Sequence, residues 1–295
     1  MKKNRATETL RGLLKKIREQ LKAAGIDNPL SNAELIISEA LHIQRPQIYL
    51  QPERKPSTLQ LRKIKKWARE RAQRKPFEYI VGKAWFREIE LLVSPQVLVP
   101  RPETELLVEQ ALKLIRAEPR IQKILDLGTG SGAIILSLAH ELKKSPRQLQ
   151  FFASDLSKPA LNIAVKNARR LGLKSQIIFQ KGDLFQAFPH QKFHIIICNP
   201  PYIPSSEIPK LMPEVSRYEP RLALDGGKDG LEIVRKIIAQ APEHLAAKGW
   251  LLMEIGQGQA SKLKSSSSPA LPLMKIAKDY SKIDRIAIFQ ASAWF

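Results

Sequence analysis

The 295-residue sequence is poor in several features, and each shortage excludes a class of protein. Its single cysteine, Cys198, cannot form a disulfide within the chain, which is typical of a reducing compartment, so we expect a cytoplasmic protein. No apolar run approaches the roughly 20 residues that a membrane-spanning helix requires, so we expect no membrane contact. The basic residues near the start are not followed by an apolar segment, which argues against a secretory signal.

Acidic residues are also scarce relative to basic ones. The chain carries 49 Lys and Arg against 28 Asp and Glu, a formal net charge of +21, and residues 1–75 alone hold 19 basic and 7 acidic side chains. Such a surface attracts polyanions, RNA first among them, although a general preference for lysine gives the same composition. The densest stretch, residues 61–75, has Trp67 as its only aromatic, which favours a solvated helix face. We therefore expect at most a weak contact with RNA through this basic surface.

The first third of the chain contains two patterns. Apolar residues recur at helical spacing over 10–21, and capping-box patterns at Ser31–Glu34 and Ser57–Gln60 predict two further helices. We therefore assign residues 1–75 to a small helical domain. Residues 76–103 are rich in β-branched and aromatic side chains with interspersed Gly and Pro, which predicts a β-hairpin linker.

Residues 104–295 alternate predicted strands and helices. Apolar strand runs such as 192–199 are separated by helical segments, which is typical of a parallel sheet covered on both faces. A last pair of strands near 273–279 and 285–290 is expected to close the sheet as a hairpin, after a Ser-rich loop at 265–268 to which we assign no chemistry. The fold class predicted is α/β, with a Rossmann-like sheet.

The first motif with chemical content is DLGTGSGAI. Gly128, Gly130 and Gly132 follow a predicted strand and precede a predicted helix, where glycines permit a tight turn and close approach to a ligand. Amides at the start of the helix then face whatever binds. The same spacing satisfies the dinucleotide pattern G-x-G-x-x-G/A, so the glycines alone do not select a cofactor.

Two acidic residues follow the next two strands. Asp155 stands where an acid accepts hydrogen bonds from ribose hydroxyls, with a helix N-cap as the structural alternative. Asp183 ends the third strand in the same way. It can accept a hydrogen bond from an adenine amino group while Leu184 or Phe185 lies on the ring. Together the two acids predict a nucleoside site beside the glycine loop.

The stretch Asn199-Pro200-Pro201-Tyr202 ends the fourth strand, beside the predicted loop. The Asn199 side-chain oxygen and the Pro200 carbonyl are two acceptors, which suit the two donors of a planar NH₂ group. The prolines fix the backbone and remove competing N–H donors, and Tyr202 offers a surface for a flat group. The motif therefore predicts a site for an amide or an exocyclic amine, with a simple strand-ending turn as the alternative.

In this order, the glycine loop, the two acids and NPPY resemble the class I S-adenosylmethionine-dependent methyltransferases that act on amide or amino nitrogens. VLVPRPETE at 97–105 and RYEPRLALDGGKDGL at 217–231 resemble the HemK/PrmC family of release factor glutamine methyltransferases. The helical domain and hairpin match this family too, so the resemblance covers almost the whole chain. DYSK near the C-terminal end departs from the family pattern, where a glycine is expected after the serine, and this puts the local turn in question.

The resemblance implies a function and a set of site residues. The protein would methylate the side-chain amide of the glutamine in the GGQ motif of peptide-chain release factors, with S-adenosylmethionine as cofactor, a helical substrate-recognition domain at 1–75 and a methyltransferase domain at 104–295. Asn199 and Pro200 would hold the reacting amide, with Pro201 and Tyr202 shaping its slot. The residues expected to contact the cofactor are Gly128, Thr129, Gly130, Ser131, Gly132, Asp155, Asp183, Leu184 and Asn199, with Thr104 closing over it.

Several other functions use the same residues. An adenine-N6 methyltransferase acting on rRNA or DNA would hold its amino group with NPPY, but it needs a base-exposing element that the sequence does not show. A glutamine methyltransferase of a ribosomal protein, a non-enzymatic ribosome-binding module and a dinucleotide oxidoreductase are the remaining alternatives. The five histidines lack metal-ligand spacing, so we expect no metal, and Cys198 is expected to be buried and not to act as a nucleophile.

Overall fold

The computed structural model describes residues 8–264 and 268–293. Contacts between residues divide the chain into two compact units. The helical unit contains the described part of residues 1–82 together with Met212–Tyr218, and the sheet unit contains the described parts of 83–211 and 219–295. Most of the predicted Ser-rich loop, 265–267, lies outside the described residues. Within the described part, no helix is both long and apolar enough to cross a membrane.

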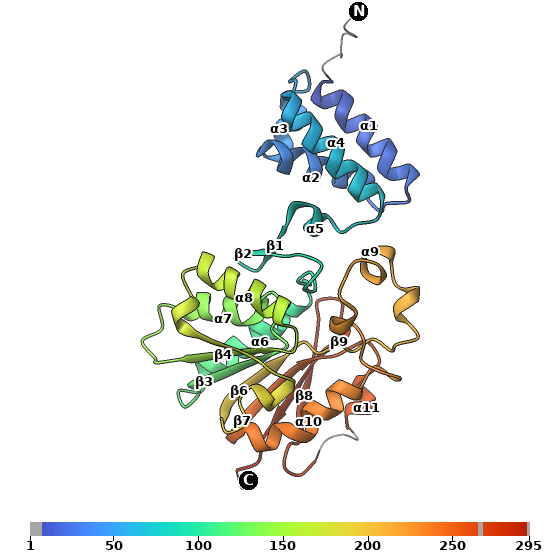
Figure 1. The fold of residues 1–295 in the computed structure, drawn as a ribbon. Helices are drawn as coiled ribbons and strands as arrows, with labels where there is room; N and C mark the ends of the chain where they lie inside the picture. The colour runs from blue at the N-terminus through green and yellow to red at the C-terminus, as the bar shows by residue number, and fades with distance from the viewer. Residues whose placement is uncertain (1–7, 265–267, 294–295) are drawn as a thin grey trace, which may run out of the picture. The chain divides into compact units, whose positions relative to one another are not determined.

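The described part of the helical unit has six helices, and the four between residues 10 and 72 pack around one apolar core (Figure 1). The helix at Leu10–Ala23 buries an apolar stripe that contains Leu10, Leu13 and Ile17. The helix at Thr58–Ala72 buries Ile64 and Ala68. Ser57 caps its helix through the predicted capping box. The helices of this unit are α1 Leu10–Ala23, α2 Pro29–Leu41, α3 Arg45–Leu50, α4 Thr58–Ala72, α5 Phe77–Val81 and α9 Pro213–Ser216.

Three local predictions for this unit were wrong. Helix α2 begins at Pro29 and not at Ser31, because proline is favoured in the first turn, where its missing N–H is not needed. Helix α3, with Pro46 in its first turn, was not predicted. The predicted linker opens with one helical turn, α5, before its strands begin.

Met212–Tyr218 is bound to the other helices of its unit by polar contacts. Glu214 accepts from Arg71 Nη1 at 2.9 Å and from Arg74 Nε at 3.0 Å, and the Tyr218 hydroxyl donates to the Gln73 carbonyl at 2.7 Å. Burial acts to raise the pKa of Glu214, but a backbone hydrogen bond and the two arginines together hold that pKa below its usual value. Met212–Tyr218 thus belongs structurally to the helical unit, although in the sequence it lies between two stretches of the sheet unit.

The predicted β-hairpin is present and belongs to the sheet unit. It consists of β1 Lys83–Phe86 and β2 Ile89–Leu92, paired antiparallel. Buried Asn167 exchanges hydrogen bonds with the Leu92 backbone and donates to the Ser131 carbonyl at 2.9 Å. One amide side chain therefore fixes both the hairpin and the predicted glycine loop.

A seven-stranded sheet forms the centre of the second unit, in the order β5-β4-β3-β6-β7-β9-β8. The five strands β3 to β7 are parallel, and the last two complete the sheet as the predicted antiparallel hairpin. This confirms the predicted α/β class. The strands are β3 Lys123–Leu127, β4 Gln150–Asp155, β5 Ile177–Lys181, β6 Phe193–Cys198, β7 Leu245–Glu254, β8 Leu273–Lys278 and β9 Asp284–Gln290.

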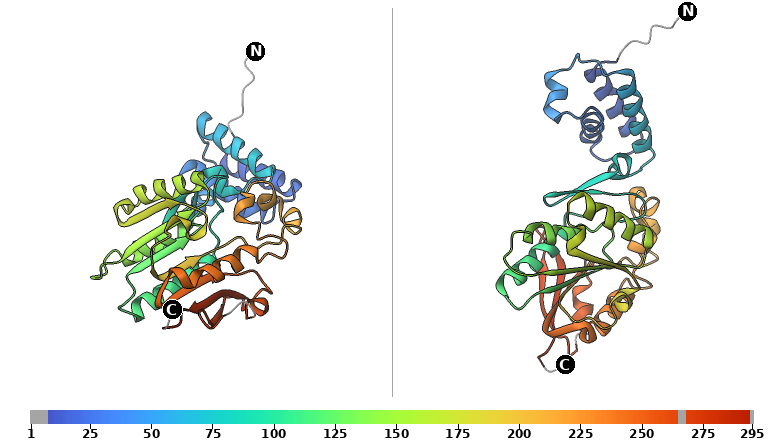
Figure 2. Two further views of the ribbon diagram at one scale, coloured as in Figure 1. Left: turned by 60° about the horizontal axis from the view of Figure 1, so that its bottom comes forward. Right: turned by 60° about the vertical axis from the view of Figure 1, so that its left-hand side comes forward.

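Helices cover both faces of this sheet (Figure 2). Alternate strand residues enter two cores because side chains alternate across a strand: Ile195 and Ile197 pack in one core and Ile196 in the other. Helices α6 Thr104–Ala117, α7 Ala133–Leu142 and α8 Lys158–Arg170 contribute to the first core, and α10 Glu232–His244 and α11 Ala260–Lys264 to the second. The 3₁₀ turns are Lys174–Gln176, Leu184–Ala187, Ile208–Lys210 and Arg221–Ala223.

Candidate active site

The carboxyl ends of four parallel strands lie in one row. The register pairs Leu127 with Ser154 and Cys198, and Cys198 with Met253. Ligands of open parallel sheets bind at this edge. The register thus brings together residues that are distant in sequence, and the next row along the edge consists of Gly128, Asp155, Asn199 and Glu254.

A cavity of about 330 Å³ opens at this edge, lined only by residues of the sheet unit. Among the predicted site residues, Gly132 and Tyr202 do not line it. The predicted residues that do are Thr104, Gly128, Thr129, Gly130, Ser131, Asp155, Asp183, Leu184, Asn199, Pro200 and Pro201.

The glycine loop has the backbone geometry that its sequence requires. Gly130 and Gly132 have φ of 56° and 85°, which favour glycine. A Cβ added to Gly132 would meet Leu136 Cδ1 at 2.7 Å, whereas one added to Gly130 would meet no atom within 4 Å. Gly130 therefore leaves open space beside the backbone, and Gly132 allows helix α7 to pack closely against the loop.

Asp155 braces this loop. Its Oδ2 accepts from the Gly130 amide at 2.8 Å, and its Oδ1 accepts from the Ser157 amide at 2.8 Å. Burial raises the pKa of Asp155, and the two backbone amides oppose that rise. Because each carboxylate oxygen has two lone-pair directions, both oxygens keep one for a ligand in the cavity. Ser157, and not Asp155, caps helix α8.

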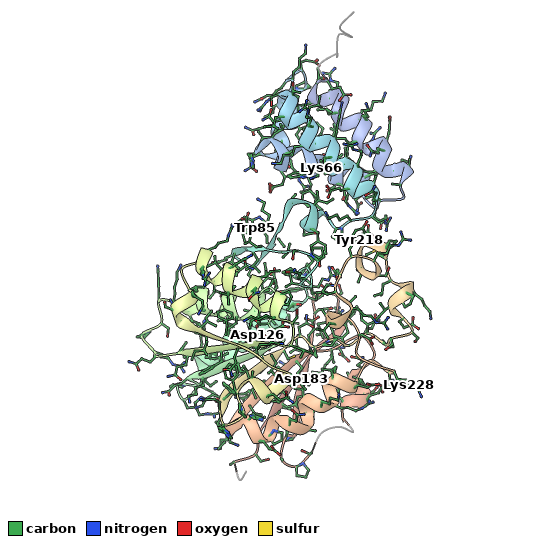
Figure 3. The ribbon with its side chains drawn as sticks, in the orientation of Figure 1. Lys66, Trp85, Asp126, Asp183, Tyr218 and Lys228 are labelled. Atoms are coloured by element: carbon green, nitrogen blue, oxygen red, sulfur yellow. The ribbon has the colours of Figure 1, made fainter. Side chains whose placement is uncertain are left out.

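Asp183, labelled in Figure 3, and Leu184 follow β5, and both residues line the cavity. Asp183 is exposed, and Leu184 has a positive φ of 46°. The Gly182 amide donates to the Asp155 carbonyl at 3.1 Å, which joins this turn to the end of β4. The turn after β4 and the turn after β5 therefore form one part of the cavity wall. Asp183 contributes an exposed carboxylate to it, and Leu184 contributes a half-buried apolar side chain.

Asp126 lies beneath the loop as a fully buried acid. Its Oδ2 accepts from the Thr129 hydroxyl at 2.7 Å. Burial raises the pKa of Asp126 to about 7, against the lowering effects of Thr129 and of the Ile135 amide. Asp126 is the first residue of the DLGTGSGAI motif, but no role was predicted for it from the sequence.

The two ends of the Asn199 side-chain amide differ in their hydrogen bonding. Its Nδ2 donates to Thr104 Oγ1 at 3.1 Å. Within residues 8–264 and 268–293, neither Asn199 Oδ1 nor the Pro200 carbonyl accepts a hydrogen bond from another residue. Both residues line the cavity, so the two predicted acceptors are available to a ligand with two N–H donors.

Glu254 is a buried acid that connects Thr104 with Tyr202. Its Oε2 accepts from the Thr104 hydroxyl at 2.6 Å, and its Oε1 accepts from the Tyr202 hydroxyl at 3.1 Å. Burial raises the pKa of Glu254, while these two hydrogen bonds and the Arg285 charge act in the opposite direction. Tyr202 therefore orients an acid instead of lining the cavity.

Glycines and one glutamine hold the NPPY backbone from behind. A Cβ on Gly226 would lie 2.8 Å from the Pro201 carbonyl oxygen, and one on Gly230 would lie 2.4 Å from that of Tyr202. Gln259 Nε2 donates to the same Tyr202 oxygen at 2.9 Å. These contacts explain why the DGGKDG stretch needs glycine, a role that the sequence analysis left open.

The two stretches that flank the site in sequence are joined by one ion pair. Arg101 Nη2 donates to Glu219 Oε2 at 2.5 Å, and the Glu219 side chain is 1% exposed. Arg101 and Pro220 both line the cavity. The pair thus closes the cavity wall between the RPETE and RYEP stretches.

Cys198 is buried at the end of β6, as predicted. Burial raises the pKa of its thiol well above the usual value, which disfavours the nucleophilic thiolate. In the part of the chain that the structure describes, no group of three or more His, Cys, Asp or Glu side chains is arranged to hold a metal ion.

Two family models match the chain: the PrmC N-terminal domain at residues 12–82 and the methyltransferase small domain at residues 102–212. A release factor glutamine methyltransferase of Geobacter sulfurreducens is 38% identical over 252 residues, covering 85% of this chain and 86% of its own. One of Thermodesulfovibrio yellowstonii is 39% identical over 284 residues, covering 95% and 98%.

A solved structure supports the fold of the sheet unit. The hMettl16 catalytic domain in complex with the MAT2A 3'UTR hairpin 6 matches with a TM-score of 0.53 at 17% identity. The match covers 70% of this chain and 76% of that one. At this identity the likeness concerns the fold alone.

Proposed function

Since the chain belongs to the release factor glutamine methyltransferase family, we propose that it methylates the side-chain amide nitrogen of the glutamine in the GGQ motif of peptide-chain release factors, using S-adenosylmethionine. The observation that carries the proposal is the pair of available acceptors, Asn199 Oδ1 and the Pro200 carbonyl, on the cavity wall. A primary amide has two N–H donors on one nitrogen, and this pair matches them.

The cavity also fits the cofactor. The open space at Gly130 lets the backbone approach a ligand, the free lone pairs of Asp155 suit a ribose diol, and Asp183 and Leu184 suit an adenine ring. When bound, the cofactor supplies an electrophilic methyl group on a sulfonium. We assign it the predicted residues Gly128, Thr129, Gly130, Ser131, Gly132, Asp155, Asp183, Leu184 and Asn199.

The chain's own contribution to the chemistry is orientation and electrostatics. An amide nitrogen is a poor nucleophile because its lone pair is delocalised into the carbonyl. By accepting both N–H bonds, Asn199 and Pro200 would increase electron density on the nitrogen and fix the direction of its attack. Pro201 and Tyr202 would shape the slot, Pro201 from the cavity wall and Tyr202 through Glu254.

Asp155→Ala is expected to weaken cofactor binding. The substitution removes two charge-assisted acceptors and the brace on the Gly130 amide. At about 1.5–3 kcal/mol for such a bond, the Kd for S-adenosylmethionine should rise on the order of 100-fold. Calorimetric titration of wild type, Asp155→Ala and the matched control Asp284→Ala, a half-buried acid of β9 outside the cavity lining, measures this. An unchanged Kd for Asp155→Ala would remove Asp155 from the cofactor site.

We propose the predicted helical domain 1–75, joined by 76–103 to the methyltransferase domain 104–295, as the region that recognises the release factor. Contact with RNA is a weaker proposal. It is supported by the exposed basic side chains of α4, among them Lys65, Lys66 and Arg69. Lys63 Nζ lies 4.5 Å from the centre of the Trp67 ring, so the cation already covers one face of the only aromatic in this stretch. This arrangement favours electrostatic attraction over base stacking.

A transfer assay with labelled S-adenosylmethionine tests the proposed substrate. The acceptors are a purified release factor, the same factor with its GGQ glutamine changed to alanine, a ribosomal protein fraction and unmodified rRNA. Label on the intact factor, lost with the alanine version, is the expected result. Label on rRNA alone would instead establish an adenine methyltransferase, and label on a ribosomal protein alone would identify a different glutamine.

A further inference from the structure

The substrate slot contains a chain of hydrogen bonds that begins at a buried acid outside the cavity lining. Glu254 is 1% exposed and accepts from Thr104 Oγ1 at 2.6 Å, and Thr104 Oγ1 lies 3.1 Å from Asn199 Nδ2. Thr104 is itself 4% exposed. The chain links three elements, β7, α6 and the end of β6, that are distant in sequence.

The donors and acceptors in these three groups fix the direction of each hydrogen bond in the series. The Thr104 hydroxyl has a single proton, and it donates that proton to Glu254 Oε2. The Thr104 oxygen is then available only as an acceptor, and the Asn199 amide must turn its NH₂ end toward it. Asn199 Oδ1 is consequently left facing the other way, where it accepts no bond from the described residues.

The second oxygen of Glu254 supports this polarity. It accepts from the Tyr202 hydroxyl at 3.1 Å, so the acid receives one O–H donor on each oxygen. Gln259 fixes the Tyr202 backbone by donating to its carbonyl at 2.9 Å. Tyr202 is therefore held at its backbone as well as through its hydroxyl, and both carboxyl oxygens of Glu254 are occupied by hydroxyl donors.

We propose that Glu254 is a positioning residue that acts through Thr104 to present Asn199 Oδ1, and not Asn199 Nδ2, to the substrate amide. The inference rests on the proposed function for the identity of that amide. It also changes the expected role of Thr104. The hydroxyl, predicted to close over the cofactor, is committed to Glu254 and Asn199, so its function is to set the orientation of the amide.

An inverted Asn199 would place an NH₂ group against the N–H donors of the substrate. Two donors facing each other lose a hydrogen bond and leave buried polar groups unsatisfied. The hydrogen-bonded series Glu254–Thr104–Asn199, here called the relay, therefore affects the orientation of the substrate amide more than the affinity for the cofactor. This separates it from a role in cofactor closure, which would raise the Kd of S-adenosylmethionine.

The kinetic test compares Thr104→Val, which has nearly the same shape but no hydroxyl, with Thr104→Ser, which keeps it. We expect Thr104→Val to lower kcat on the order of 10- to 100-fold, from the loss of one or two oriented hydrogen bonds. Thr104→Ser should restore most of that loss, and the Kd for S-adenosylmethionine should stay within about threefold in both, well below the effect of a lost hydrogen bond. A Thr104→Val enzyme with wild-type kcat and weakened cofactor binding would overturn the relay.

A double-mutant cycle tests whether Glu254 acts through Thr104. Glu254→Gln leaves one acceptor for two hydroxyl donors, and we expect it to lower kcat in the wild-type background but not further in Thr104→Val. Glu219→Gln, a second buried acid that is paired with Arg101, is the matched control and should be additive with Thr104→Val. Additive effects of Glu254→Gln and Thr104→Val would contradict the proposal.

A readout without cofactor or substrate keeps this test separate from the proposed function. In protein labelled with ¹⁵N in asparagine side chains, the Asn199 NH₂ signals can be identified by their absence in Asn199→Ala. We expect one of these protons to move upfield in Thr104→Val and to return in Thr104→Ser. An Asn199 signal insensitive to Thr104 would overturn the relay, whereas a sensitive signal in an enzyme inactive on release factors would overturn only the proposed substrate.

Discussion

Asn199→Ala is expected to lower kcat for methyl transfer about 10³-fold, near the upper range for loss of one preorganised polar contact in an active site. The substitution removes the acceptor that we propose fixes the reacting nitrogen, and it also removes the donor to Thr104. The Pro200 carbonyl remains, but a single acceptor leaves the amide free to rotate about that bond. The rate should therefore fall much more than the affinity for the release factor, which is set by a larger contact area.

The measurement is a single-turnover transfer assay at saturating cofactor, together with the cofactor Kd from calorimetry. Asn162→Ala, on the exposed side of α8, is the matched control and should transfer methyl groups at the wild-type rate. Because Asn199 is also among the predicted cofactor contacts, the two readouts separate its roles. Near-normal transfer by folded Asn199→Ala would show that the reacting amide is held elsewhere.

The parts of the fold that the sequence predicted well have strong local signals. Strands with continuous apolar runs, such as 193–198, and the glycine loop after β3 were found because burial on both faces and positive φ each restrict the residue type. The error at α2 arose where two helix signals compete. At α2, a proline in the first turn prevailed over a capping-box pattern two residues later.

The residues of the candidate site also fall into those with a strong local sequence signal and those without one. Residues whose chemistry is visible within one short motif, such as Asn199 and Asp155, could be identified from the sequence and do line the cavity. Glu254 could not, because its partners Thr104 and Tyr202 lie 150 and 52 positions away. A signal did exist: like Asp155, Glu254 is an acid at the carboxyl end of a parallel strand. Its meaning depended on the strand order, which places β7 beside β6.

Asp126→Asn is expected to stabilise the protein at alkaline pH relative to wild type, by an amount that grows as pH rises. Burial raises the pKa of Asp126 from an ordinary value of 3.8 to about 7. The protonated acid is therefore favoured in the folded state, and stability is lost as pH rises through the interval from about 4 to about 7. Asparagine stays neutral and can keep an acceptor for Thr129, so it avoids that loss.

The size of the effect follows from the two pKa values. Their difference corresponds to about 4 kcal/mol above pH 7, of which about 3 kcal/mol should develop between pH 5 and pH 8. Urea unfolding at both pH values measures it, with tryptophan fluorescence followed in a Trp67→Phe background so that the helical unit does not contribute. The difference in unfolding free energy between Asp126→Asn and wild type should be larger at pH 8.

Glu88→Gln is the control, because it removes an exposed acid from the same unit. Its difference in unfolding free energy from wild type should be the same at pH 5 and pH 8. If Asp126→Asn showed the same stability difference at pH 5 and pH 8, Asp126 would be ionised throughout that range. Its charge would then have to be balanced by the two donors that face it, the Thr129 hydroxyl and the Ile135 amide in the first turn of α7.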